Sequence, residues 1–195
     1  SSISNFYFLD GTNYTPVDNV IFTVHVVNIL TLDENSTVIP AGTTSTVDIC
    51  VNRTIKANEW STICFPFAMS VDKLKAAFGD DYQLAEFTGY SAEKDADNKV
   101  TRLTINFEPN TKAAKINTPY ILKPSLDQDI SGFAVNAKLN PGNTKKTIFV
   151  EDEDLGEEVE IVSMTGTYQA GTLVPENSLF LSGNNFYYSV GKTKR

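Results

Sequence analysis

Short segments rich in β-branched and aromatic residues recur along the whole chain, and they constrain its fold more than any other feature. About five to nine residues long, they alternate apolar and polar side chains, with Gly, Asn, Asp and Pro between them. A period of two is typical of strands with one buried face, and the intervening residues are typical of turns. The pattern therefore predicts an all-β protein, an antiparallel sandwich or a barrel-like sheet.

The expected strands follow one another along almost the entire sequence. They cover residues 5–9, 20–32, 46–53, 60–69, 82–90, 99–107, 119–123, 132–139, 146–150, 158–168, 178–182 and 185–190. Gly183 and Asn184 can supply the positive φ angles of a two-residue hairpin turn. Pro66 has no N–H to donate, so the strand that begins at Trp60 is expected to be an edge strand or to break there.

One short helix is expected among these strands, at about residues 71–78. Ser70 can cap its N-terminus, Leu74 and Phe78 recur at helical spacing, and Gly79 suits a left-handed stop. A helix of about two turns is not stable alone. We therefore expect it to cover the edge of a sheet or the end of a barrel.

The 195 residues are expected to form a single β-rich domain. The best candidate for a boundary within it is the polar stretch 33–45. This stretch would separate an N-terminal segment with its own strands, residues 1–42, from a main part, residues 43–195. A piece of that length buries too little area to fold independently. A separate segment is the alternative that this boundary leaves open.

The charge balance bears on the class of partner. Lys and Arg number 16 against 24 Asp and Glu, which leaves a formal net charge of -8. A nucleic-acid binder normally displays a basic face, so nucleic acids and anionic membranes are poor candidates. The longest charge-free apolar stretch, residues 20–32, is shorter than the roughly 20 residues that span a bilayer. We expect neither a nucleic-acid partner nor a transmembrane segment in this chain.

Catalytic signatures are missing from the sequence. The single histidine, His25, has apolar neighbours on its strand, and one His with two distant Cys matches neither a catalytic triad nor a zinc site. Acidic pairs such as Asp80 with Asp81, or Glu86 with Glu108, can be nominated for glycoside hydrolysis, but surface acids are the simpler interpretation. We therefore expect a protein that is not an enzyme, with no catalytic residues and no metal site.

Calcium is the only cofactor that the sequence suggests at all. Hard oxygen ligands cluster in two places, Asp95 with Asp97 and Asn98, and residues 151–154 with Glu157, Glu158 and Glu160. Neither stretch has the Gly and Glu spacing of an EF-hand loop. Exposed polar loops without a cofactor are the simpler interpretation.

Cys50 and Cys64 are the only cysteines. If residues 46–53 and 60–69 form a hairpin in which Ile55 opposes Glu59, Cys50 opposes Cys64. A disulfide between them then requires Cβ atoms about 3.8 Å apart, which only a non-hydrogen-bonded strand pair offers. The alternatives are a structural disulfide and two free buried thiols.

Aromatic side chains are the only positive indication of a binding surface. Flat rings on a rigid sheet can stack on sugars or anchor a protein partner. Six are available, namely Trp60, Tyr90, Tyr120, Tyr168, Tyr187 and Tyr188, of which Trp60, Tyr90, Tyr187 and Tyr188 are the candidate ligand-binding residues. Adjacent strand residues point to opposite faces, so we expect at least one of Tyr187 and Tyr188 to be exposed. Core or cross-strand packing is the alternative for each ring.

Several stretches of the chain form a recognisable series of motifs, namely residues 53–67 (RTIKANEWSTICFPF), 75–79 (KAAFG), 84–87 (LAEF), 117–123 (NTPYILK), 164–168 (MTGTY) and 179–187 (LFLSGNNFY). Together they resemble a recurring β-rich domain of secreted and surface proteins of gut anaerobes in the Bacteroides group. The resemblance covers residues 47–190 and carries no catalytic signature. In that family one more strand usually follows the hairpin, whereas this chain stops at Arg195.

The resemblance implies an exported, adhesin-like setting at the cell exterior or the outer-membrane surface, with the signal sequence absent from this chain. On that basis we expect a non-catalytic extracellular surface module with a cell-adhesion or protein-interaction role. The alternative is a carbohydrate-binding module of a polysaccharide-handling surface protein. The expected partner is a protein or a glycan at the cell exterior.

Overall fold

The computed structural model describes residues 7–10, 13–16, 29–152 and 157–194. The elements in these ranges are β1 (Tyr7–Asp10), β2 (Asn13–Pro16), β3 (Ile29–Asp33), β4 (Val47–Ile55), β5 (Ser61–Ile63), α1 (Val71–Phe78), β6 (Gln83–Lys94), β7 (Val100–Pro109), β8 (Tyr120–Lys123), β9 (Ile130–Ala137), β10 (Lys145–Asp152), β11 (Glu157–Thr165), β12 (Leu179–Ser182) and β13 (Asn185–Tyr188). The predicted all-β class with one short helix is confirmed.

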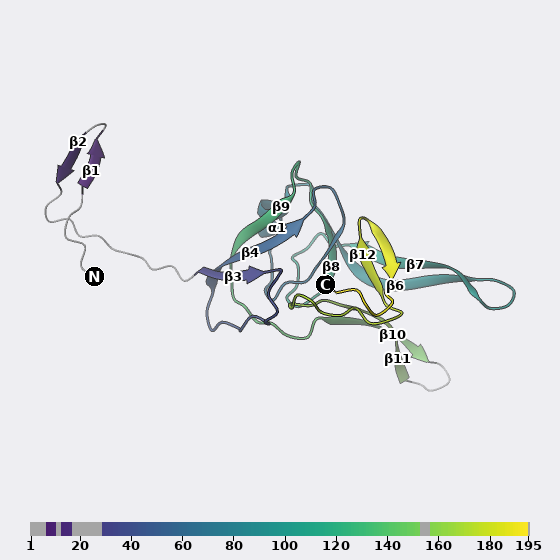
Figure 1. Ribbon diagram of the computed structural model, residues 1–195. Coiled ribbons are helices and arrows are strands. Elements are labelled where there is room, and N and C mark those ends of the chain that lie inside the picture. Colours follow the sequence, from purple (N-terminus) through teal and green to yellow (C-terminus); the bar gives the residue numbers. More distant parts are fainter. Residues whose placement is uncertain (1–6, 11–12, 17–28, 153–156, 195) are drawn as a thin grey trace.

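Two sheets build the main body (Figure 1). One has four antiparallel strands in the order β5-β8-β6-β7, and the other has three in the order β3-β4-β9. A single cluster of buried side chains joins the sheets, the helix and the loops between them, and it includes Ile49, Val51, Ile55, Ile63, Phe67, Leu74, Phe78, Leu84, Tyr120 and Leu122. Neither sheet closes into a barrel within the described residues, so the arrangement is that of a sandwich.

The sheet around β4 departs from the expected antiparallel pairing. β3 runs parallel to β4, whereas β9 pairs with β4 antiparallel. Because β3 precedes residue 43 and yet lies in this sheet, the N-terminal part of the chain contributes to the main body. Residues 17–28, which hold His25 and most of the strand predicted at 20–32, lie outside the described residues.

The predicted hairpin between the two cysteines is wrong. Cys50 on β4 lies opposite Ala134 of β9, and β5 pairs with β8 instead of β4. Both cysteines are free thiols in this structure. The physical reason lies in β5, which ends at Ile63 shortly before Pro66 and is too short to accompany the whole of β4. The expectation of an edge strand broken near Pro66 is confirmed.

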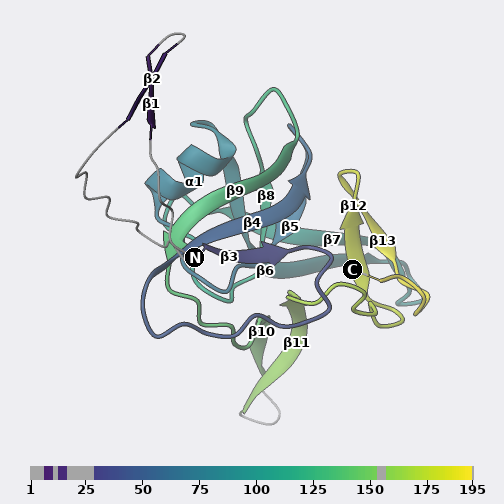
Figure 2. The same ribbon diagram turned by 60° about the vertical axis from the view of Figure 1, so that its left-hand side comes forward.

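The predicted helix is confirmed within the same bounds. The Ser70 hydroxyl accepts a hydrogen bond from the Lys73 N–H at 3.4 Å, and Gly79 ends the helix with a φ of 94°. Leu74 and Phe78 are completely buried. Phe78 meets Phe133 of β9 edge-to-face, with ring centroids 5.2 Å apart, so the helix covers one side of β9 (Figure 2).

The described residues also form three two-stranded hairpins, namely β1–β2, β10–β11 and β12–β13. The turn of the last one is as predicted, because Gly183 and Asn184 have φ angles of 52° and 64°. β6 pairs antiparallel with β7, and both strands are longer than the segments 82–90 and 99–107 that the sequence predicts. No helix in the described part of the chain is long and apolar enough to cross a membrane.

Candidate binding surface

Aromatic side chains of β7 and of both faces of the hairpin β12–β13 lie at the surface, where Phe186, Tyr187 and Tyr188 are exposed and Phe107 and Phe180 are half-buried. The ring of Phe186 lies face to face with that of Phe107, with centroids 6.1 Å apart and planes inclined by 10°. On the opposite side of the hairpin, Tyr187 stacks on Phe180 with centroids 5.8 Å apart and planes inclined by 27°. We call Phe107, Phe180, Phe186, Tyr187 and Tyr188 the aromatic surface.

The turn of the hairpin is tied to the start of β5. The side-chain oxygen of Asn184 accepts a hydrogen bond from the backbone N–H of Trp60 at 2.7 Å. Gly183 and Asn184 both adopt the positive φ that a tight turn requires. The hairpin is therefore held at its tip by this hydrogen bond and along one side by the Phe107–Phe186 stack.

A continuous series of rings leads from the core to this surface. Phe87 on β6 is 3% exposed and lies opposite Phe107 on β7, with ring centroids 5.7 Å apart. Phe107 in turn stacks on Phe186, which is 42% exposed. Rings that rest on a packed core lose little conformational entropy when a partner covers their free side.

The composition of the hairpin favours binding of flat or apolar groups. Tyr187 and Tyr188 are 49% and 67% exposed. Neither β12 nor β13 contains a charged residue, so covering their side chains removes no ionised group from water. Tyrosine combines a large apolar ring with a hydroxyl that can still hydrogen-bond. This surface can therefore receive aromatic or aliphatic protein side chains, or the apolar face of a sugar ring.

The four candidate ligand-binding residues are distributed unevenly around this surface. Tyr187 and Tyr188 belong to it, and Trp60 contacts the hairpin through its backbone N–H. Tyr90 lies opposite Ile105 on the β6–β7 pair and makes no ring contact within the described residues. The phenylalanines of the aromatic surface are not recognisable from the sequence, because an apolar residue of an amphipathic strand has the same pattern as a core residue.

Two of the six aromatic residues considered have structural roles instead. Tyr120 is 1% exposed, and its hydroxyl accepts a hydrogen bond from the Lys115 N–H at 3.1 Å. The hydroxyl of half-buried Tyr168 donates to the side-chain oxygen of Asn117 at 2.6 Å. Both rings are thus committed to packing and to internal hydrogen bonds.

Cys64 lies in the same internal network as Tyr168. Its Sγ is 3.7 Å from the Tyr168 hydroxyl, and burial raises the pKa of the thiol to about 11. A Cβ on Gly166 would lie only 2.6 Å from the Cβ of Cys64, so the two chain segments pack directly against each other. Because the thiolate is the reactive form of cysteine, a thiol with a raised pKa is a poor nucleophile.

The acidic pairs nominated from the sequence do not face each other across a cleft. Glu86 and Glu108 are cross-strand neighbours, and Glu86 forms an ion pair with Lys146 of β10. Asp80 and Asp81 are exposed where the chain leaves α1. Asp80, Asp81 and Glu108 are thus surface acids, whereas Glu86 is half-buried and engaged by Lys146.

The first candidate calcium loop is closed by its own hydrogen bonds. One Asp95 carboxylate oxygen accepts the backbone N–H groups of Asp97 and Lys99, at 3.0 and 2.9 Å. Within the described ranges no three Asp, Glu, His or Cys side chains are grouped as metal ligands. The second acidic stretch includes residues 153–156, which lie outside the description.

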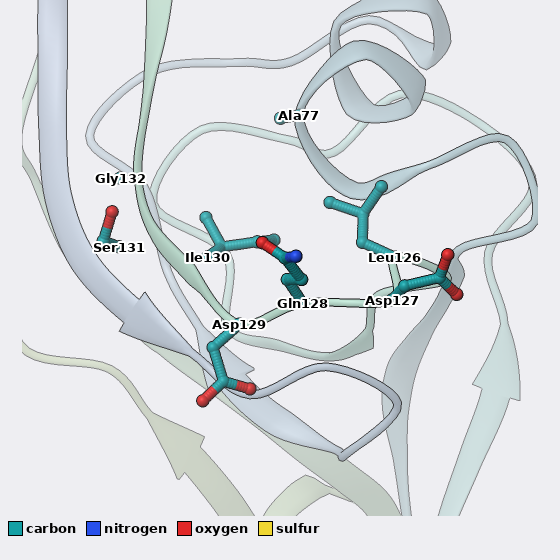
Figure 3. A pocket seen from close by; sticks show the side chains of 8 residues that line it. All are labelled: Ala77, Leu126, Asp127, Gln128, Asp129, Ile130, Ser131 and Gly132. Carbon is teal, nitrogen blue, oxygen red and sulfur yellow. The ribbon is translucent and has the colours of Figure 1, made fainter.

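Two shallow depressions lie away from the aromatic surface. The first, of about 490 Å³, is lined by Ala77 of α1 and by residues 126–132 (Figure 3). One of its carboxylates, Asp129, is paired with Lys56 at 2.5 Å, and the hydrogen bond from Lys56 lowers the pKa of this carboxyl. The second, of about 590 Å³, is lined by Thr46, Ala68, Lys73, Ile116, Asn136, Ala137, Lys138 and Asn140.

No protein-family model, curated protein or solved structure matches the chain. The resemblance to the Bacteroides-group surface domain therefore stays a prediction. The stretches that carry the resemblance contact one another in two places. Residues 53–67, 117–123 and 164–168 contribute Cys64, Asn117 and Tyr168 to the internal network, and residues 179–187 form the hairpin that binds the Trp60 backbone.

Proposed function

We propose that this chain is a non-catalytic module of an exported bacterial surface protein, which binds another protein through the aromatic surface. The observation that supports this role is the exposure of Phe186, Tyr187 and Tyr188 on a charge-free hairpin anchored to the core through Phe107. Tyrosine and phenylalanine are enriched in protein interfaces, and tyrosine is also enriched among the residues that carry most of the binding energy. The exported setting is supported by the motif resemblance.

Carbohydrate binding is the second candidate function. Tyr187 has one ring face stacked on Phe180 and is still half exposed, which leaves surface on which a sugar ring can lie. Stacking of this kind is the usual contribution of an aromatic side chain to a carbohydrate-binding module. A glycan and a protein would therefore bind at the same surface, and a binding screen distinguishes between them.

The test is a binding screen of the purified chain against matrix proteins and a glycan array, repeated with two variants. Tyr187→Ala removes a ring of the aromatic surface, and Phe149→Ser removes a similarly exposed ring on β10 as the matched control. A protein ligand whose affinity falls about tenfold or more with Tyr187→Ala alone supports the proposal.

Three other results contradict it. Binding that is lost equally in both variants indicates a nonspecific apolar contact. A glycan ligand without a protein ligand replaces the first candidate with the second. Turnover of a polysaccharide in the same samples would overturn the non-catalytic assignment altogether.

A further inference from the structure

Strand β13 is the outer strand of its hairpin. Its partner β12 lies against β5, and Asn184 in the turn between the two strands accepts the Trp60 N–H just before β5 begins. The other edge of β13 has no strand beside it in the described part of the chain. Figure 2 shows β13 at the outside of the hairpin, next to β12.

The hydrogen-bond pattern shows which backbone groups point outward from β13. The Ser189 N–H donates to the Ser178 carbonyl at 2.8 Å, and the register places Tyr187 opposite Phe180. In an antiparallel pair, hydrogen-bonded and non-hydrogen-bonded residues alternate. The N–H and C=O groups of Phe186 and Tyr188 therefore point away from β12, toward solvent.

This edge carries none of the features that usually prevent strands from pairing. Exposed edges are generally blocked by charged residues, proline, bulges or a covering element. The edge strand β7 contains Arg102, Glu108 and Pro109, and the backbone of β9 at Asn136 accepts a hydrogen bond from Lys73 of α1. Residues 185–190 contain neither a charged residue nor a proline, and all except Ser189 are exposed.

We propose that β13 pairs antiparallel with β13 of a second copy of this chain, about a two-fold axis at Tyr187. In this register Phe186 of each copy opposes Tyr188 of the other, and each pair exchanges two backbone hydrogen bonds. The two hairpins then form one four-stranded sheet, which is more stable than two separate two-stranded sheets. This dimer rests on the proposed function and specifies its protein partner as a second copy of the chain.

A second copy fits this edge because the edge is complementary to itself. Phe186 and Tyr188 are placed symmetrically about Tyr187, as a two-fold contact requires. Their side chains then form cross-strand aromatic pairs on one face, while the two Tyr187 rings meet on the other. The absence of charge in residues 185–190 avoids repulsion at the contact, although each copy carries a formal charge of -8. Association is therefore expected to strengthen as salt screens the long-range repulsion.

The test is sedimentation equilibrium of the whole chain from about 5 to 500 μM, at low and moderate salt. Tyr188→Pro removes an outward N–H, and it spares the β12–β13 ladder, in which that group takes no part. Tyr188→Lys keeps the N–H and adds a charge to the edge. Phe149→Ser removes an exposed ring elsewhere. Far-ultraviolet circular dichroism and the thermal midpoint of each variant show whether the fold is retained.

We expect a monomer–dimer equilibrium whose dissociation constant rises at least about tenfold in both Tyr188 variants and stays unchanged in Phe149→Ser. A chain that is monomeric over the whole range overturns the inference, as does a dimer that folded Tyr188 variants leave intact. If that monomer binds a matrix protein and loses the binding with Tyr187→Ala, the proposed function stands without the homotypic contact.

Discussion

Phe107 on β7 and Phe186 on β13 lie face to face, with ring centroids 6.1 Å apart and planes inclined by 10°. This stack joins the C-terminal hairpin to the four-stranded sheet, because Phe107 also packs on the buried ring of Phe87. The Asn184–Trp60 hydrogen bond is a second attachment at the tip of the hairpin. The position of the aromatic surface thus depends on two contacts between segments that are distant in sequence.

Loss of the stack is expected to loosen the hairpin. Phe186→Ala removes the ring that rests on Phe107, and we expect a loss of about 1–2 kcal/mol in the free energy of unfolding, measured by urea titration. Tyr188→Ala, at a more exposed position of the same strand, is the control and should cost at most about 0.5 kcal/mol. Equal losses in the two variants would show that the stack contributes no specific stability.

Asn184 has two separable roles, which two substitutions distinguish. Asn184→Gly keeps the positive φ of 64° and removes the hydrogen bond to Trp60, so we expect a loss of about 0.5–1.5 kcal/mol. Asn184→Ala also puts a residue that tolerates the left-handed region less well than asparagine or glycine at this φ, which adds a further loss of about 1 kcal/mol. Urea unfolding of the two variants measures the loss due to the hydrogen bond and the loss due to the backbone conformation. An Ala variant as stable as the Gly variant would contradict the backbone argument.

Local features of the fold were predictable because they depend on neighbouring residues. Ser70 and Gly79 define both ends of α1 through the cap hydrogen bond and the positive φ. Gly183 and Asn184 similarly define the turn between β12 and β13. In such cases the residues that carry the signal are the residues that make the contact.

Pairings between distant segments were not predictable in the same way. Cys50 and Cys64 lie on segments that look like a hairpin, yet β4 is completed by β9 and by the parallel strand β3. The exposed ring of Phe186 likewise has the apolar character of a core residue, and only its stacking on Phe107 reveals where it lies. A strand pattern shows which face is apolar without naming the strand that covers it.

The ion pair between Lys146 and Glu86 is expected to hold β10 against β6. Its side chains are 23% and 27% exposed, whereas Lys145 and Glu160 in the neighbouring pair are 41% and 43% exposed. Double-mutant cycles with Lys→Met and Glu→Gln should give a coupling of about 1 kcal/mol or more for the first pair and about 0–0.5 kcal/mol for the second. Equal couplings would show that burial does not strengthen the contact.

The raised pKa of Cys64 predicts a loss of stability in alkali. In the folded chain the thiol has a pKa of about 11 because burial disfavours the thiolate, whereas the ordinary value is 9.0. Below about pH 8 the thiol is protonated in both states, so it adds no pH dependence. Between pH 9 and about 11 it ionises mainly in the unfolded chain, which lowers the free energy of unfolding by up to about 1.4 kcal/mol per pH unit.

Comparison of Cys64→Ala with the wild type separates the contribution of Cys64 from the rest of the loss in unfolding free energy at high pH. Burial also raises the pKa of Tyr168, so the wild type and the variant should both lose stability as the pH rises further. Urea unfolding at intervals from pH 8 to 11 should therefore give a shallower decline for Cys64→Ala, whatever the substitution costs at pH 8. Parallel declines would mean that Cys64 ionises equally easily in both states. The thiol would then be far more accessible to water than its packing against Gly166 and Tyr168 implies.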